Sequence, residues 1–273
     1  MSMPDTNRPD WSHFFAVDEV DEPNQLIAFL DVAKSLPGTV AAKAEILERL
    51  EPQRASSALD VGCGYGADVI ELSKRLLPGG RATGVDVSET MITEARRRAA
   101  NNGVDASFEI ADALALPFAD NTFDICRIET VLQHIADPGQ AVAEMVRVTR
   151  PGGRIAALEF DVATAFLDHP DAELWLTIRS SFTNAAVQPS IGRQIPRLFA
   201  AARLTGVQAT PRVIASTPSF FRVLLSRDVN QLCATGVVSG DRAARWWAAM
   251  DEAAARGYFT GGATAFVVSG TVS

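Results

Sequence analysis

Length, composition and charge exclude several classes of protein. The 273 residues are 47% hydrophobic, which excludes a disordered chain and fits one α/β domain with additions. The net charge of -8, from 25 basic and 33 acidic residues, repels polyanions, so we expect no nucleic-acid partner. The basic run at 96–98 is interpreted as the solvated face of a helix.

The cysteines and the first residues indicate the compartment. Cys63, Cys126 and Cys233 are far apart and form no CxxC pair, which argues against a disulfide framework or a zinc site and fits a reducing cytoplasm. Residues 1–10 lack the pattern of a signal peptide, and no apolar run is long enough to span a bilayer. We therefore expect a cytoplasmic protein without membrane insertion.

The middle of the chain alternates short apolar runs with amphipathic stretches. In order, they predict a strand at 57–61, a helix at 67–77, a strand at 81–86 and a helix at 89–101. This alternation is typical of βαβ units, in which the strands pair in parallel and helices cover the sheet.

Three more strands of the same sheet follow. Apolar runs predict strands at 106–110, 123–127 and 154–159. A helix is predicted at 138–149, and a Pro-Gly-Gly turn at 151–153 separates it from the third of these strands.

The last third of the chain continues the pattern with a longer interruption. It predicts a helix at 194–202, a strand at 207–216 and a final strand at 264–268. Between the two strands lies a helical stretch at 218–256, which is too long for a hairpin turn.

Three segments lie outside the alternating core and could cover a ligand. We interpret 1–45 as an N-terminal helical lid and 46–273 as the core. Within the core, an irregular stretch at 162–190 and the helical stretch at 218–256 are interpreted as lid insertions. That these segments merely extend the core is an equal alternative.

A glycine-rich loop joins the first predicted strand to the first helix. Gly62, Gly64 and Gly66 permit a tight turn and a close approach of the backbone to a ligand. Gly62, Gly64 and Ala67, with Asp86 about 20 residues later, also satisfy the dinucleotide fingerprint. An NAD-dependent oxidoreductase is therefore one alternative.

Asp60 bears on the choice of ligand. Two residues before Gly62, its carboxylate would repel a pyrophosphate, whereas it suits a ligand that carries an ammonium and a sulfonium group. A carboxylate that caps the amides of the loop is compatible with both ligands.

This loop resembles motif I of class I methyltransferases that depend on S-adenosylmethionine (SAM). The chain is similar to the small-molecule branch often labelled type 11, which includes ubiquinone and menaquinone methyltransferases. Four further motifs between residues 84 and 154 occur in the family's order, which is far more specific than one glycine loop. The resemblance implies that the SAM site includes Asp60, Gly62, Cys63, Gly64 and Gly66.

The further motifs imply roles for residues that follow later strands. By resemblance, Asp86 accepts hydrogen bonds from the ribose hydroxyls and Val87 flanks the adenine. Asp112 and Ala113 match the motif at the adenine edge, and Glu129 lies in the segment that lines the methionine moiety.

The resemblance covers residues 45–160 and implies a fold and a reaction. The fold is a Rossmann-like, seven-stranded, mostly parallel sheet with an antiparallel last strand, and 207–268 could supply that hairpin with a helical insertion. The cofactor is SAM, and the partner is a small-molecule methyl acceptor. The acceptor and the oligomeric state stay open.

His134 is the candidate general base. Methyl transfer from a sulfonium is an in-line displacement that needs a base only when the acceptor carries a proton. His134 follows the fourth strand at the edge where α/β sheets bind ligands, and it places O-methylation slightly ahead of C- or N-methylation. A packing role is the alternative for this histidine.

Other polar residues near the same edge are weaker candidates for contact with the acceptor. Glu159 and Asp161 could orient an acceptor, and Arg193 could meet an anionic or carbonyl-bearing one, but ion pairing or solvation explains them as well. The sequence shows no set of metal ligands, so we expect no metal. A SAM-binding fold with a non-methylating activity is a further alternative.

Overall fold

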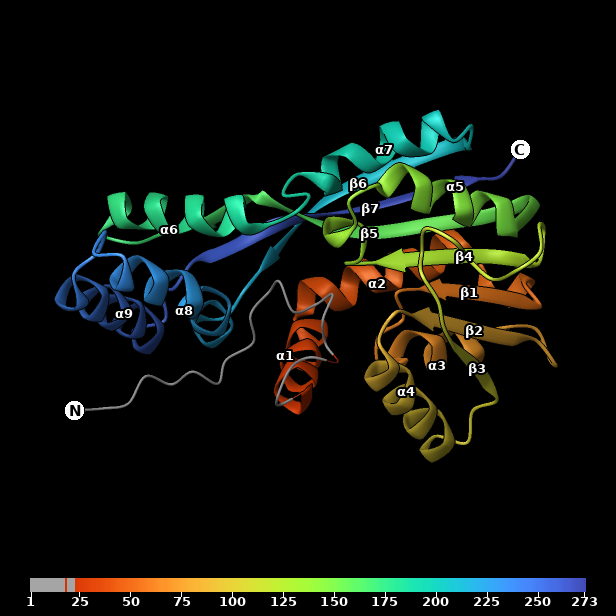
Figure 1. The fold of residues 1–273 in the computed structure, drawn as a ribbon, viewed down its shortest axis with the longest axis horizontal. Helices are drawn as coiled ribbons and strands as arrows, with labels where there is room; N and C mark the ends of the chain where they lie inside the picture. Colours follow the sequence, from red (N-terminus) through yellow and green to blue (C-terminus); the bar gives the residue numbers. More distant parts are fainter. Residues whose placement is uncertain (1–17, 19–22) are drawn as a thin grey trace.

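One seven-stranded sheet organises the molecule (Figure 1). The computed structural model describes residue 18 and residues 23–273, with the side chains of this second range described from residue 27 onward. The strand order is β3-β2-β1-β4-β5-β7-β6. The strands are β1 (Ser57–Val61), β2 (Arg81–Asp86), β3 (Ala106–Ile110), β4 (Phe123–Glu129), β5 (Thr149–Leu167), β6 (Thr205–Ala215) and β7 (Gly261–Thr271).

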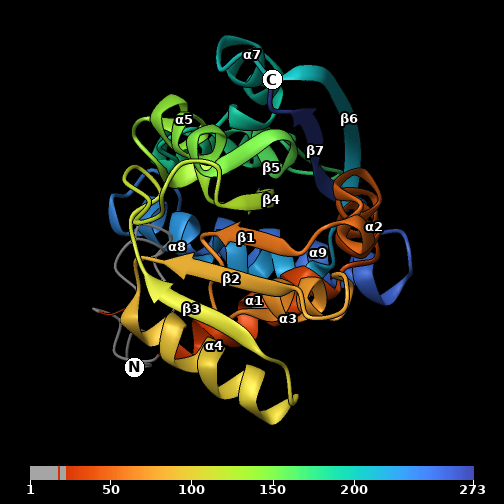
Figure 2. The ribbon, with the colours of Figure 1, turned by 90° about the vertical axis from the view of Figure 1, so that its right-hand side faces the viewer.

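Helices cover both faces of the sheet (Figure 2). One face carries α2 (Pro37–Leu50), α3 (Ala67–Ser73) and α4 (Glu89–Asn101), and the other carries α5 (Pro138–Val148) and α7 (Ile191–Ala201). The remaining elements near the core are α1 (Pro23–Ser35), η3 (Pro52–Arg54) and η4 (Leu132–His134). No helix within the described part of the chain is long and apolar enough to cross a membrane.

β1 and β2 lie inside the sheet and are largely buried, because a parallel strand between two helical layers is a nearly continuous apolar run. Both have the predicted bounds, and so does the edge strand β3, in which only Phe108 is buried. In β4, Ile125 packs toward α2, α3 and α4, whereas Cys126 and Ile128 pack toward α5 and α7. This alternation follows from the two-residue period of a strand.

The direction of the strands confirms the predicted fold class. β3, β2, β1, β4 and β5 pair in parallel, so their carboxyl ends share one edge of the sheet. β7 lies between β5 and β6 and is antiparallel to both, as expected for the last strand. In open α/β sheets the edge formed by the carboxyl ends binds ligands.

Two helical predictions were wrong at their boundaries. The helix predicted at 67–77 ends at Ser73, and the N–H of Leu77 instead donates to the carbonyl of Ala55 at 2.9 Å. The single stretch predicted at 218–256 is two helices, α8 (Pro218–Ala234) and α9 (Gly240–Ala255). The chain turns at Gly236, which has φ 74°, a conformation that favours glycine.

The stretch predicted to be irregular at 162–190 is mostly regular. β5 continues to Leu167 because its end pairs with the start of β7 beyond a bulge. α6 (Ala172–Ala185) follows, and the side chain of Asp171 caps it by accepting the N–H of Leu174 at 3.1 Å. The pairing of β5 with β7 joins segments about 100 residues apart in sequence, which local patterns do not reveal, whereas the Asp171 cap is a local signal.

α6, α8 and α9 form a helical lobe at one end of the sheet (Figure 1). Its own hydrophobic cluster includes Ile178 of α6, Phe221 of α8 and Trp246 of α9. The long ends of β5 and β7 connect this lobe to the core, and Figure 1 places it beyond the carboxyl ends of β1 and β2.

Candidate functional site

The glycine loop between β1 and α3 has the geometry of a ligand cradle. Gly62, Gly64 and Gly66 have φ of 68°, 52° and 77°, which L side chains rarely adopt. A Cβ on Gly62 would lie 2.2 Å from Cγ2 of Val131, so this glycine is required by packing. A Cβ on Gly64 would meet nothing within 4 Å, so the loop has open space at its middle.

Cys63 anchors this loop rather than reacting. Its N–H donates to the carbonyl of Val85 at 2.8 Å, which ties the loop to β2. Its side chain is buried beside Gly84, and burial raises the pKa of the thiol well above its usual value. A thiol in this state is a poor nucleophile.

Asp86 ends β2 directly beside the open loop. Its Oδ2 accepts the N–H of Gly64 at 2.9 Å and its Oδ1 accepts the N–H of Ser88 at 3.0 Å. A carboxylate has about four lone-pair positions, so both oxygens keep capacity for a ligand. Burial raises the pKa of Asp86 above its ordinary value.

Apolar side chains flank Asp86 and are open to solvent. Val87 is 51% exposed, and Ile110, which pairs in register with Asp86, is 52% exposed. Ala113 is buried below them, and the carboxylate of Asp112 accepts the N–H of Leu114 at 2.9 Å. The structure therefore gathers the residues predicted for the ribose and adenine at one edge.

Asp18 closes the same edge from the N-terminal segment. Its carboxylate accepts the hydroxyl of Ser88 at 2.7 Å and the N–H groups of Glu89 and Thr90 at 3.0 Å. Asp18 thus helps to cap the N-terminus of α4, whose N-cap residue, Ser88, directly follows Val87. The sequence analysis did not identify this residue.

A cluster of buried charges lies beneath the glycine loop. Asp60 of β1 and Arg127 of β4 are partners in the parallel register, and the Arg127 Nε lies 3.5 Å from the Asp60 Oδ1. Arg127 is 3% exposed, and its guanidinium also pairs with Glu129 and with Asp68 at 3.3 Å. One cation thus holds three carboxylates in place.

Two lysines from the N-terminal helices complete this cluster. Lys43 of α2 lies 2.7 Å from Asp68 and 2.8 Å from Glu129, and Lys34 of α1 lies 3.0 Å from Asp68. A cavity of about 210 Å³ opens on Lys43, Asp68 and Arg127 between α2 and α3. We call Lys34, Lys43, Asp60, Asp68, Arg127 and Glu129 the charge cluster.

Burial and pairing set the protonation of the cluster. Burial raises the pKa of Asp60 to about 6, against the opposing effect of Arg127. Burial also acts to raise the pKa of Asp68, but Arg127 and the two lysines outweigh it and hold this pKa well below its usual value. Asp60 is therefore the member closest to gaining a proton near neutral pH.

Asp60 and Glu129 were predicted at the site from the sequence, but their partners were not. Arg127 was counted only as the last residue of a strand, and Lys34, Lys43 and Asp68 were not singled out. An arginine inside a buried parallel strand needs a counter-ion, and this was the available signal.

The segment after β4 is held over the loop by a buried carboxylate. Glu159 accepts the N–H groups of Val131 and Leu132, each at 2.8 Å, and of Gln133 at 3.4 Å. Burial raises the pKa of Glu159 to about 8. Thr130 has φ 53°, a strained value for a β-branched residue at the edge of the site. Glu159 thus positions this segment and does not face an acceptor.

His134 lies at the end of η4 and is half-buried. Its Nε2 lies 3.1 Å from the side-chain amide nitrogen, Nε2, of Gln133. Burial lowers its pKa to about 4, so the imidazole is neutral at pH 7 and weakly basic.

Arg193 and Asp161 form an ion pair. The Arg193 Nη2 lies 2.9 Å from the Oδ1 of the buried Asp161, so the two side chains engage each other.

No group of three or more His, Cys, Asp or Glu side chains within the described residues could hold a metal ion.

Comparisons with known proteins show the family of the chain. A family model described as a methyltransferase domain matches residues 52–203. An uncharacterized 37.1 kDa protein in a transposon of Streptomyces fradiae is 36% identical over 251 residues, which cover 89% of this chain and 70% of that protein.

A shorter match and a solved structure extend the comparison. The ubiquinone/menaquinone biosynthesis C-methyltransferase UbiE of Bdellovibrio bacteriovorus is 42% identical over 102 residues, which cover 37% of this chain and 43% of that enzyme. The match thus spans less than half of the enzyme's length. The YcgJ protein from Bacillus subtilis shares the fold, with a TM-score of 0.61 and 20% identity, over 85% of this chain and 98% of its own.

Proposed function

Because the chain belongs to the methyltransferase domain family and is a SAM-dependent methyltransferase, we propose that it methylates a small organic acceptor at the carboxyl edge of the sheet. Family membership decides against the NAD-dependent oxidoreductase. The observation that carries the proposed site is the open space at Gly64 beside the carboxylate of Asp86.

The residues at this edge fit SAM. Gly64 leaves room for the ligand, and Asp86 keeps acceptor positions for the two ribose hydroxyls. The exposed side chains of Val87 and Ile110 offer apolar surface to the adenine ring. The proposed cofactor-binding residues are Asp60, Gly62, Cys63, Gly64, Gly66, Asp86, Val87, Asp112, Ala113 and Glu129.

Asp60 and Glu129 are proposed to act on the cofactor from beneath the glycine loop. Their carboxylates are engaged by Arg127, and Glu129 also by Lys43, so they act as fixed charges under the cationic part of the cofactor. A preorganised carboxylate needs no rearrangement when a cation arrives. The cluster has three cations and three carboxylates, so its proposed part is to hold Asp60 and Glu129 in fixed positions beneath the methionine moiety.

Bound SAM supplies an activated methyl group on its sulfonium. The protein has to align the acceptor with that methyl group and exclude water, which is the main source of rate in such displacements. Val131 over Gly62, held by Glu159, fixes the segment on the side of the loop where the acceptor would lie.

The acceptor atom is proposed to be oxygen, with carbon as the rival. His134 is neutral but weakly basic, so it suits a hydroxyl that ionises readily, such as a phenol or an enol. The relative UbiE is named a C-methyltransferase, which supports carbon in an electron-rich ring. Both acceptor classes are small molecules.

The N-terminal segment and the helical lobe are proposed to cover the acceptor. Tyr65 of the glycine loop is buried between cations, with Lys34 of α1 4.6 Å and Arg98 4.1 Å from its ring centroid. α1 thus packs on the loop, and Figure 1 shows the lobe beyond it. Residues 1–17 and 19–22 of the proposed lid, 1–45, lie outside the described residues. The three cysteines are free, which supports the proposed cytoplasmic location.

An acceptor screen tests the proposed reaction. Purified protein is incubated with methyl-labelled SAM and with phenols, enols, quinols and amines, and the labelled product and S-adenosylhomocysteine are measured. Transfer to phenols or enols in preference to amines supports O-methylation, and transfer to a quinol ring carbon selects the rival. A parallel incubation contains mixed cellular protein and RNA in place of the small molecules, and transfer in that incubation alone contradicts a small-molecule acceptor.

A further inference from the structure

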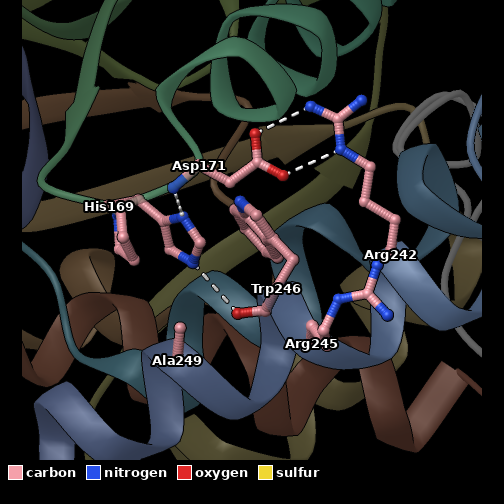
Figure 3. A pocket seen from close by; sticks show the side chains of 7 residues that line it. His169, Asp171, Arg242, Arg245, Trp246 and Ala249 are labelled. Carbon is pink, nitrogen blue, oxygen red and sulfur yellow. Dashed lines mark hydrogen bonds and ion pairs between the residues drawn. The ribbon is translucent and has the colours of Figure 1, made fainter.

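A second cavity lies in the helical lobe, away from the carboxyl edge of the sheet (Figure 3). Its volume is about 410 Å³, within the range of small-molecule sites. It is lined by residues 169–171 of the connection between β5 and α6 and by Arg242, Arg245, Trp246 and Ala249 of α9. None of these residues belongs to the proposed cofactor site.

One wall of the cavity is rigid. His169 accepts the N–H of Asp171 at Nδ1 and bonds the carbonyl of Trp246 at Nε2, each at 3.0 Å. The ring is therefore the neutral tautomer with its proton on Nε2. It stacks on the Trp246 indole with a centroid distance of 4.8 Å. His169 thus shapes the wall and has no nitrogen left for a ligand.

One residue of the lining, Trp246, has a buried donor without a hydrogen-bond partner among the residues that the structure describes. Trp246 is 1% exposed, yet its indole N–H has no hydrogen-bond partner within the described residues. An unpaired buried donor costs about 1–3 kcal/mol, so such groups mark places where an acceptor belongs. Figure 3 shows this edge of the indole directed toward the side of the cavity where Asp171 lies.

The two arginines of the lining differ in their ion pairs. Arg242 pairs with Asp171 at 2.8 Å and with Glu173 at 3.0 Å, whereas Arg245 has no ion pair with any described residue. The lining has two guanidinium groups and one carboxylate, and Glu173 outside the lining also pairs with Arg242, so Arg245 is the lining cation without a counter-ion among the described residues. An unpaired guanidinium attracts an anion.

We propose that this cavity binds a small organic carboxylate with one negative charge. Its oxygens would pair with the guanidinium of Arg245 and take the indole N–H of Trp246, and its apolar body would lie against Pro170 and Ala249. The unpaired guanidinium of Arg245 selects an anion, and one unpaired guanidinium matches one carboxylate group. This site is independent of the proposed cofactor site, because the two share no residue.

Benzoate is the probe that tests this site, and benzamide is its neutral counterpart. Calorimetric titration of the full chain should give saturable benzoate binding that is about tenfold tighter than benzamide binding. Arg245→Gln should weaken benzoate about tenfold, and Ala249→Leu, which fills the cavity, should abolish binding. Arg256→Gln removes the same charge from the end of α9 outside the cavity and should leave benzoate binding unchanged.

The titration also separates this site from the cofactor site. SAM affinity should be the same in wild type, Arg245→Gln and Ala249→Leu. If benzoate fails to saturate the wild-type protein, or binds both cavity variants as tightly as wild type, the proposal is overturned.

The indole resonance of Trp246 provides a direct readout. The chain has four tryptophans, so a nitrogen-15 spectrum has four indole N–H signals, and Trp246→Phe identifies the one that disappears. Benzoate should shift that signal in the wild-type protein and leave it in place in Ala249→Leu. A benzoate effect on the other indoles that spares Trp246 would overturn the proposed contact.

Discussion

Beneath the glycine loop, the buried charges are paired, because Arg127 faces Asp60, Asp68 and Glu129, although its Nε makes no hydrogen bond with any described residue. In the helical lobe, the indole N–H of Trp246 has no partner and Arg245 has no ion pair within the described part of the chain. Paired charges fix a geometry, whereas a cation without a counter-ion leaves capacity for a ligand. The first region is therefore proposed as a rigid floor for the cofactor, and the second as a binding site of its own.

Arg127→Met should produce the largest effect, because it leaves three carboxylates under the loop without their shared cation. The free energy of unfolding should fall by about 3–5 kcal/mol, as measured by urea denaturation. Arg75→Met is the control, because its exposed pair with Glu71 should contribute no more than about 1 kcal/mol. Equal losses in the two variants would contradict a structural role for the cluster.

Two glycines of the same loop should respond differently to alanine. Gly62→Ala forces a methyl group against Val131 and should cost about 3 kcal/mol of stability. Gly64→Ala has room for its methyl group and should cost only about 1–2 kcal/mol. Because that methyl group occupies the proposed ligand space, Gly64→Ala should also weaken SAM about tenfold by calorimetry. If Gly64→Ala binds SAM as tightly as wild type, the ligand does not lie against the middle of this loop.

Asp86→Ala should weaken SAM by about 2 kcal/mol, because a charged acceptor of two hydrogen bonds is lost. Calorimetric titration measures this as roughly a thirtyfold rise in Kd. Asp105→Ala removes an exposed carboxylate between β2 and β3 and should leave the Kd unchanged. An unaltered Kd in Asp86→Ala would remove this residue from the ribose site.

His134→Gln should have the smallest effect on the enzyme. If the imidazole accepts the acceptor's proton, kcat at pH 7 should fall about tenfold while the Kd for SAM stays constant. Above pH 6 the wild-type rate should show no step from this residue, because its pKa is about 4. A rate equal to wild type would leave His134 with a packing role.

The same histidine should make stability depend on pH. Its pKa falls from 6.5 in the unfolded chain to about 4 in the fold, so the unfolded state binds the proton first as the pH drops. The contribution of His134 to stability should therefore be retained above pH 6.5 and be lost between pH 6.5 and 4. In urea titrations at several pH values, His134→Gln should lose less stability than wild type over this window.

The bounds of the first three strands were predictable from the sequence, whereas the full lengths of β5 and β7 were not. β1 and β2 match because a strand that is buried between two helical layers has a nearly continuous apolar sequence. The edge strand β3 also has the predicted bounds, although only Phe108 in it is buried. β5 and β7 are longer than predicted because their ends pair with each other, and that pairing is not local. The break between α8 and α9 did have a local signal, Gly236 followed by the capping Ser239.

The site was predictable where a motif carries it. Gly62, Gly64, Gly66 and Asp86 lie together as the family resemblance implies, because the loop and the end of β2 are adjacent in a parallel sheet. The role of Arg127 depends on the register that sets it opposite Asp60, and sequence alone does not give a register. The lobe cavity joins two segments about 75 residues apart, so no motif could reveal it.

Parallel calorimetric titrations of the purified protein with SAM, S-adenosylhomocysteine and NADH test the central claim most directly. The account predicts that SAM and S-adenosylhomocysteine bind, that NADH does not, and that Asp86→Ala and Gly64→Ala both weaken SAM. Binding of NADH alone, or SAM binding that neither substitution changes, would contradict a SAM site at the carboxyl edge of the sheet.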